Sequence, residues 1–446
     1  MPLGPQRAIV ESSVAWMSTF FDSDASLLRY PSDTRRHAVR ESLWYAAGLL
    51  QLGHTDVALR VFDAVLALQY DRPGTVWDGT WPRTREEPYP RDAAVIWRDY
   101  DPNWRQFIGC LLGVLLRDCE ETLGPERCER AKAAIARAIR GEPPERIAAS
   151  YSNIALMQAW LLFEFGERAR GERLATEIER LYFDDGGFSE FNSPTYYGVD
   201  LWGLALWRRS GSTLLVAAGR RLEIALWRDV AMFYHPGMRN LCGPYDRAYG
   251  MDMTRYASLL GLWIWWANGD EARPFPDVSR PFGHAHDFCA APLMAFAPPT
   301  ISDEARGAMS VLPDGRNILR RVSNRTITAA LYRDLMLGAV DRAPHDPTGQ
   351  STPVAAHWID AENAIGWLCI RGALGARVTD SRLELHGDAE LTLRCSGAPR
   401  FGKREWMIGG RRIEATGMDV VAQQDRNGQP THVVKMTSGE AVLVFA

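Results

Sequence analysis

The spacing of the apolar residues changes once along this 446-residue chain, and the change limits the folds open to it. Up to about residue 268, apolar residues recur at the spacing of amphipathic helices, as in 37–52 with Val39, Leu43 and Leu50 on one face. After about residue 301, short alternating runs rich in β-branched residues replace the helical pattern. Helices first and strands second predict two domains and exclude an alternating βαβ fold.

The helical segments come in pairs. They recur roughly every 45 to 70 residues, which predicts antiparallel hairpins arranged as an α/α toroid, here an incomplete barrel. The predicted pairs are 37–52 with 55–69, 102–123 with 125–140, 150–165 with 171–183, and 194–209 with 212–234, and 251–267 begins a fifth.

The alternating runs predict a C-terminal antiparallel β-sandwich, because turn sequences separate several of them. The chain is therefore expected to be an α+β multidomain protein, with a catalytic toroid at 1–270, a linker at 271–301 and the sandwich at 302–446. The predicted strands are Arg325–Arg333, Ile365–Arg371, Arg382–Leu385, Glu390–Arg394, Arg411–Glu414, His432–Met436 and Ala441–Phe445.

Charge and composition exclude several classes of function. The 51 basic and 55 acidic residues nearly cancel, which argues against a nucleic-acid-binding surface or a polybasic membrane anchor. The sequence has no apolar stretch of about 18 residues and no secretory signal, so we expect no membrane association and a cytoplasmic location. The seven cysteines have no metal-type spacing, which predicts free thiols in a reducing compartment.

A recurring local pattern marks the candidate site. Aromatic and polar residues surround a proline, which favours a helix start, at four places. If these helix starts meet at one rim of a toroid, their polar side chains converge there. Asp101 and Ser193 are good helix caps, so capping or local packing is the alternative for any single residue. The four copies are Tyr30–Asp33, Tyr100–Trp104, Phe191–Tyr197 and Gly243–Tyr249.

The densest of these stretches is Tyr245-Asp246-Arg247-Ala248-Tyr249. The planar fork of Arg247 can hold a carboxylate, and a tyrosine beside such a cation loses its proton more easily. Asp246 alternatively pairs with an arginine or caps a helix. His235, shortly before this loop, titrates in a useful range, although a single histidine is often structural.

One segment resembles a known family. Glu190-Phe-Asn-Ser-Pro-Thr-Tyr196-Tyr-Gly198 is similar to the Asn-Ser-Pro-x-Tyr helix start of polysaccharide lyases of the heparinase II/III and alginate lyase type. Those lyases pair an α/α toroid with a C-terminal β-sandwich. Tyr-Asp-Pro-Asn-Trp-Arg and Gly-Pro-Tyr-Asp-Arg-Ala-Tyr-Gly-Met-Asp also resemble uncharacterised fungal and bacterial proteins.

The resemblance implies a carbon–oxygen lyase that cleaves a uronate-containing saccharide by β-elimination. It implies that Asn192 neutralises the uronate carboxylate, that Tyr249 or Tyr245 is the acid and base, that His235 is a second base, and that Arg247 clamps the carboxylate. The expected substrate-binding residues are Tyr196, Tyr197, Glu190, Asp101, Trp104, Asp246 and His357.

Three alternatives stay open. An inverting glycoside hydrolase would use Asp99 or Asp101 with Glu190 or Asp246 as its acid and base. A small-molecule dehydratase or cyclase would hold an apolar substrate in a tryptophan-rich funnel, and a non-catalytic protein would only bind carbohydrate. We expect an acidic saccharide or small molecule as partner, and no cofactor. We also expect no metal, because the two histidines of His284-x-His286-Asp287 alone are insufficient to indicate a metal site. The oligomeric state is not predicted.

Overall fold

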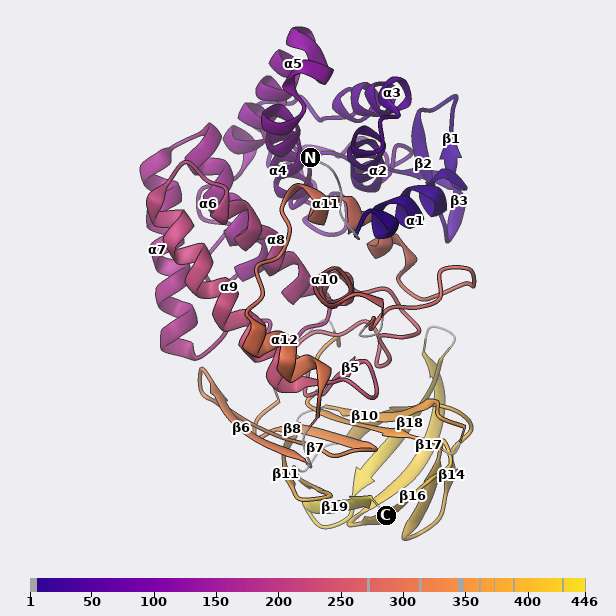
Figure 1. Cartoon of the computed structure of the whole chain (residues 1–446). Helices are drawn as coiled ribbons and strands as arrows, with labels where there is room; N and C mark the ends of the chain where they lie inside the picture. The colour runs from indigo at the N-terminus through magenta and orange to yellow at the C-terminus, as the bar shows by residue number, and fades with distance from the viewer. Residues whose placement is uncertain are drawn as a thin grey trace. The chain divides into compact units, whose positions relative to one another are not determined.

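The computed structural model describes residues 6–270, 273–312, 315–343, 349–360, 362–372, 374–387, 390–426 and 429–445 (Figure 1). The chain forms two compact units, each assembled from separate segments. The first unit consists of 1–180, 198–223 and 278–300, and the second of 181–197, 224–277 and 301–446. The domain boundaries expected at residues 270 and 301 stay a prediction.

The predicted fold class is confirmed: helices fill the N-terminal part, and antiparallel sheets fill the C-terminal part, in the order of an α/α toroid followed by a β-sandwich. Within the described residues, the α-helices are α1 Arg7–Ser18, α2 Val39–Gln51, α3 Thr55–Leu66, α4 Trp104–Asp118, α5 Glu120–Gly141, α6 Ser152–Phe165, α7 Arg168–Asp185, α8 Tyr196–Arg208, α9 Thr213–Phe233, α10 Leu259–Asn268, α11 Ala291–Phe296 and α12 Asp303–Ser310.

Antiparallel helix pairs form the core of the first unit. Helix α2 packs on α3, and α4 packs on both α5 and α6. Nearly every side chain of α6 from Ser152 to Leu162 is buried, as expected for a helix that is apolar all round. A β-carbon added at Gly113 would lie 2.8 Å from the Trp160 ring, so α4 and α6 approach closely because glycine has no side chain there.

The second unit contains a β-sandwich. One sheet has eight strands in the order β17-β18-β13-β10-β9-β8-β7-β6, and the other has six in the order β11-β12-β19-β16-β15-β14. These strands are β6 Arg316–Val322, β7 Arg325–Leu331, β8 Leu335–Val340, β9 Val354–Ile359, β10 Ile365–Arg371, β11 Gly375–Thr379, β12 Arg382–His386, β13 Glu390–Cys395, β14 Arg400–Phe401, β15 Glu405–Ile408, β16 Arg411–Thr416, β17 Met418–Arg426, β18 Gln429–Met436 and β19 Glu440–Phe445.

Alternate residues of the strands fill the space between the two sheets. Leu335 and Leu337 of β8 point into this core, as do Leu383 and Leu385 of β12 in the other sheet. Successive side chains of a strand point to opposite faces of the sheet. Apolar residues at every second position therefore all point into the core. Trp358 of β9 is completely buried in the same core.

The opposite face of β8 and β9 is also buried, because the segment 240–253 covers it within the second unit. His357 contacts Met251 there, and Tyr245 pairs with Thr352 just before β9. A β-carbon added at Gly338 would lie 1.8 Å from the Gly243 carbonyl oxygen. The covering segment can therefore lie on the sheet only because position 338 has no side chain.

Most of the predicted elements are present, but the sandwich strands β6, β8, β9, β11, β14, β15 and β17 were not predicted, and four further differences follow. The proline at 31 precedes strand β3 (Asp33–Ala38), and not a helix. Strand β3 pairs with β2 (Leu27–Tyr30), which pairs in turn with β1 (Phe21–Asp22). The segment after Pro244 is irregular up to α10, which therefore begins later than predicted. Helix α1 was not predicted, and α11 lies inside the segment read as a linker. The two remaining strands, β4 Tyr234–His235 and β5 Asn240–Leu241, form a small hairpin.

The seven cysteines are all free thiols, as predicted. Among the described residues, no helix combines the length and apolar character needed to cross a membrane.

The close approach at Gly338 predicts a large effect of a single methyl group. We expect Gly338→Ala to lower the free energy of unfolding by about 1–3 kcal/mol, because two backbone segments must separate. Gly307→Ala is the matched control: it lies in α12 with no atom within 4 Å of the added carbon, and should raise stability by about 0.5–1 kcal/mol. Urea denaturation followed by circular dichroism measures both. Equal midpoints for Gly338→Ala and the unaltered chain would contradict the packing described.

Candidate functional site

The second unit brings two tyrosines and an arginine together. Tyr196 opens helix α8, and its backbone N–H donates to the Ser193 hydroxyl at 3.1 Å, so Ser193 caps the helix as predicted. The hydroxyl oxygens of Tyr196 and Tyr249 lie 2.6 Å apart and share a hydrogen bond. The Arg247 guanidinium lies over the Tyr196 ring, 4.4 Å from its centre, in a cation–π contact.

Two further side chains hold Arg247 in place. Its Nη1 donates to Glu190 Oε1 at 2.8 Å, and its Nε donates to Gln350 Oε1 at 2.8 Å. The backbone N–H of Ala248 donates to the Gln350 carbonyl, which ties the same loop to the segment before β9. Glu190 therefore orients Arg247 and balances its charge.

The two phenols differ in exposure. Burial raises the pKa of Tyr196 well above the usual value, so this phenol stays neutral and can donate a hydrogen bond. Tyr249 is 37% exposed, which leaves its hydroxyl accessible to a ligand. The accessible hydroxyl of Tyr249 therefore hydrogen-bonds to the neutral phenol of Tyr196, and the Arg247 guanidinium lies over the Tyr196 ring.

Asn192 lies beside this cluster in a left-handed backbone conformation, with φ of 55°. Its Nδ2 donates to the carbonyls of Cys242 and Pro244, at 2.6 and 2.8 Å, so both N–H bonds of the amide are engaged. Its Oδ1 is buried without a hydrogen-bond partner among the described residues. The amide fastens the 242–244 backbone, and its N–H groups are not available for a substrate carboxylate.

Two other predicted residues are buried and engaged in hydrogen bonds. Tyr245 donates to the Leu241 carbonyl, and burial raises its pKa well above the usual value. The Nε2 of His235 lies 2.7 Å from the Tyr332 carbonyl and its Nδ1 accepts from the Met238 N–H, while burial lowers its pKa. A neutral His235 that donates through Nε2 satisfies both contacts.

The remaining predicted residues of the second unit are also paired or buried. Asp246 accepts a hydrogen bond from Arg325 Nη1 at 2.7 Å, which is the arginine pairing anticipated as an alternative. Tyr197 is 1% exposed and stacks edge-on against Phe191. His357 is fully buried, and its Nε2 lies 2.8 Å from the Met251 carbonyl.

Asp101 and Trp104 belong to the first unit, so they are described apart from this cluster. Asp101 Oδ1 accepts from the Asn103 N–H at 2.9 Å, and burial raises the pKa of Asp101. Arg40 lies 4.5 Å from the centre of the Trp104 ring. Both residues make local contacts just before or at the start of α4, which is the packing alternative; the N-cap residue of α4 is Asn103, so Asp101 is not the cap.

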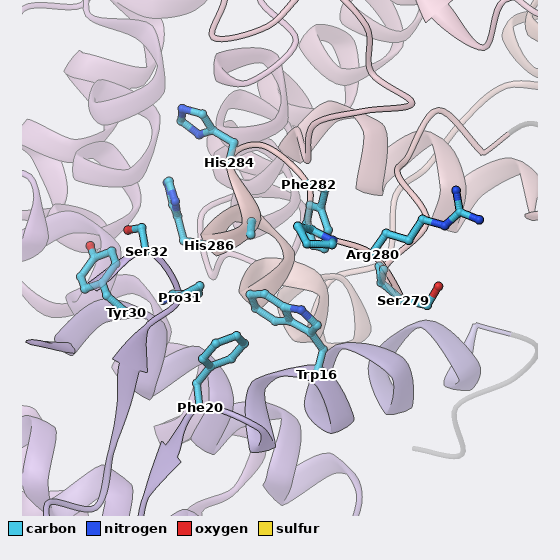
Figure 2. Close-up of a pocket in the computed structure, with 13 residues that line it drawn as sticks. Trp16, Phe20, Tyr30, Pro31, Ser32, Ser279, Arg280, Phe282, His284 and His286 are labelled. Carbon is cyan, nitrogen blue, oxygen red and sulfur yellow. The ribbon is translucent and has the colours of Figure 1, made fainter. Parts of the chain in front are cut away.

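The first unit contains a pocket of about 680 Å³ that the sequence did not reveal (Figure 2). Trp16 and Phe20 line it from the end of α1, with ring centres 5.0 Å apart, and Phe282 packs on Trp16 at 5.8 Å. Figure 2 shows these rings together with His284 and His286 around the same space. The walls come from segments more than two hundred residues apart, so no local pattern indicated them.

Comparison with known proteins gives a family without an assigned activity. The family described as "Domain of unknown function (DUF8769)" matches residues 7–299. No curated protein matches the chain.

Three solved structures are similar over nearly the whole chain. The chondroitin AC lyase of Streptomyces coelicolor A3, in complex with chondroitin sulphate, is 12% identical with a TM-score of 0.46, over 99% of this chain and 80% of that one. A chondroitinase AC lyase studied with oligosaccharides is 9% identical with a TM-score of 0.39, over 100% and 81%. A GH127 β-L-arabinofuranosidase from Geobacillus stearothermophilus T6 is 12% identical with a TM-score of 0.29, over 100% and 76%. These similarities are too distant to assign a reaction to this chain.

The burial of His357 predicts a loss of stability in acid. Burial lowers the pKa of His357 from 6.5 to about 4, so the folded chain binds fewer protons here than the unfolded chain between those values. The stability that neutral His357 contributes is therefore fully present above its pKa in the unfolded chain. It is lost as the pH falls from there toward the pKa in the folded chain. From about pH 7 to about pH 5 this histidine should cost about 2 kcal/mol of unfolding free energy.

Replacement of His357 tests this expectation. In His357→Gln the amide can still donate to Met251, but it cannot be protonated, so the loss of stability between the two pH values should shrink by about 2 kcal/mol. His54→Ala, at an exposed histidine, should leave the loss unchanged. Urea unfolding at both pH values measures the difference. An unchanged pH dependence in His357→Gln would show that this histidine is not buried neutral.

Proposed function

The chain belongs to the family described as "Domain of unknown function (DUF8769)", and we propose that this member is a carbon–oxygen lyase that cleaves a uronate-containing saccharide by β-elimination. Tyr249 is the group that exchanges a proton with the substrate. Tyr196 and Arg247 support it, and Glu190 and Gln350 hold Arg247.

The observation that carries this proposal is the pair of phenols beside a guanidinium. In β-elimination the enzyme removes the proton next to the uronate carboxylate and returns a proton to the leaving oxygen. When Tyr249 acts as the base, its phenolate oxygen accepts the hydrogen bond of Tyr196, 2.6 Å away. Arg247 lies 4.4 Å from the Tyr196 ring centre and adds positive charge at the place where negative charge develops.

Arg247 is also the group best suited to the substrate carboxylate. Its Nη1 and Nε bind Glu190 and Gln350, and its Nη2 makes no hydrogen bond to the described residues. The side chain is 27% exposed, so one face of the fork is accessible. Neutralising the carboxylate acidifies the adjacent C–H bond, which is the step that elimination requires.

Asn192 then has a different role from the one that the family resemblance implies. Because its N–H groups hold the Cys242 and Pro244 carbonyls, Asn192 positions the loop that carries Arg247 and Tyr249. His235 and Tyr245 similarly support the backbone around the site through buried hydrogen bonds. Substrate contacts by Tyr197, Asp246, His357, Asp101 and Trp104 stay predictions.

The inverting hydrolase has weaker support from the carboxylates. Its general acid needs a raised pKa, which burial gives Asp101 of the first unit, whereas ion pairs favour the ionised form. Glu190 pairs with Arg247 and Asp246 pairs with Arg325. The pKa of Asp99 is lowered to about 2, mainly by its hydrogen bond with Arg98.

The reaction itself separates the candidate functions. We expect the purified chain, incubated with a panel of uronate-containing glycans that includes chondroitin sulphate, to produce the ultraviolet absorbance of an unsaturated uronate. New reducing ends without that absorbance would indicate hydrolysis. Turnover of an apolar alcohol instead would indicate a dehydratase, and glycan binding without any product would indicate a binding protein; each of these three results would overturn the proposal.

Removing the Tyr249 hydroxyl is the sharpest test of its role. Tyr249→Phe keeps the ring and should lower kcat/KM of the elimination by at least about 100-fold, because positioned acid–base groups contribute about that much. Tyr89→Phe is a matched control at a tyrosine that is 58% exposed in the first unit. It should retain full activity. Near-normal elimination by Tyr249→Phe would remove this residue from the mechanism.

A further inference from the structure

The buried carboxylate of Asp287 lies between two histidines, and one of its oxygens has no hydrogen bond within the described part of the chain. The residue is only 4% exposed, and its Oδ2 has no hydrogen-bond partner among the described residues. Oδ2 lies 3.7 Å from Nδ1 of His284, and Oδ1 lies 3.5 Å from Nε2 of His286. A buried carboxylate oxygen without a hydrogen bond costs free energy, so its retention here points to a missing partner.

The spacing of these atoms fits a metal ion. One donor atom from each of His284, His286 and Asp287 lies within 4.8 Å of the others. Four donors at zinc–ligand distances in a tetrahedron are about 3.3–3.5 Å apart. The separation of Asp287 Oδ1 from His286 Nε2, 3.5 Å, and that of Asp287 Oδ2 from His284 Nδ1, 3.7 Å, are close to that value and too long for hydrogen bonds.

Simple ion pairing explains the cluster less well. A hydrogen-bonded ion pair would bring donor and acceptor to about 3.2 Å or less, whereas the two separations here are 3.5 and 3.7 Å. A neutral imidazole is the form that binds a metal. Arg40 and Glu41 also lie near His286 and pair with each other at 2.5 Å, and Arg280 lines the same pocket. Asp287 is the carboxylate that lies against both histidines and can balance the charge of a cation there.

The backbone presents these ligands from a firmly packed turn. His284 has a left-handed conformation with φ of 52°, and the short helix Ala285–Ala290 follows it. The Ser13 hydroxyl of α1 donates to the Phe288 carbonyl at 2.8 Å, and Phe288 is completely buried. The three ligands are therefore held on a fixed support, as a pre-organised metal site requires.

We infer that His284, His286 and Asp287 form a binding site for one divalent transition-metal ion of the Zn²⁺ type in the first unit. Two imidazole nitrogens and one carboxylate oxygen are the donor set that zinc accepts when a fourth position is left open. Both histidines also line the 680 Å³ aromatic pocket (Figure 2). A ligand in that pocket can supply an oxygen to the fourth position.

Metal binding can be measured without any substrate, so this proposal stands or falls separately from the lyase proposal. Chelator-treated protein is titrated with Zn²⁺ in a calorimeter, and metal content is measured after dialysis. We expect a single Zn²⁺ per chain. Asp287→Asn and His286→Ala should weaken binding by roughly 100-fold or more, since even the groups that orient ligands contribute 10- to 100-fold. His54→Ala, an exposed histidine in the same unit, should bind as the unaltered chain does.

Co²⁺ in place of Zn²⁺ gives a second, spectroscopic measurement of the site. Four-coordinate Co²⁺ absorbs strongly in the visible range, and we expect that band in the unaltered chain and its loss in Asp287→Asn. Circular dichroism shows whether each variant is folded. No Zn²⁺ uptake by the unaltered chain, equal affinity in Asp287→Asn and His54→Ala, or the weak spectrum of six-coordinate Co²⁺ would each overturn the inference.

Discussion

One amide group connects the segments from which the candidate site is built. Asn192 donates from Nδ2 to the carbonyls of Cys242 and Pro244, so the start of α8 is joined to the loop that carries Arg247 and Tyr249. The same loop pairs through both backbone groups of Tyr245 with the residue before β9. Removing one partner from a buried hydrogen bond costs about 1–3 kcal/mol, so these few bonds are a strong constraint.

The polar residues of the second unit divide into two groups according to burial. The fully buried ones, such as Tyr245 and His357, have their donors bound to backbone carbonyls, and burial holds both in the neutral form. Tyr249 is partly exposed and lies at the edge of an ordered chain of contacts that runs through Tyr196 to Arg247. A group that transfers protons must be accessible to its substrate and held by fixed neighbours. Tyr249 is partly exposed, and its contact with Tyr196 holds its hydroxyl in place.

The sequence predicted long, strongly patterned elements well and other elements poorly. Strand β10 has the predicted bounds, Ile365–Arg371, because turn residues flank an alternating run. Strand β9 was missed because both of its faces are buried, which removes the alternation that marks a strand. Pro31 was wrongly interpreted as a helix start. A proline indicates a helix start only from its local sequence, whereas the pairing of β2 with β3 is a tertiary interaction.

The sequence by itself determined the order of helices and strands and the cap at Ser193, since these depend on local spacing and side-chain chemistry. Only the tertiary structure decided which of the candidate side chains are accessible. It buried His357, engaged the Asn192 amide, and brought His284 and His286 to the pocket beside Trp16. Burial and hydrogen-bond partners come from segments far apart in the chain, so no local pattern contains them.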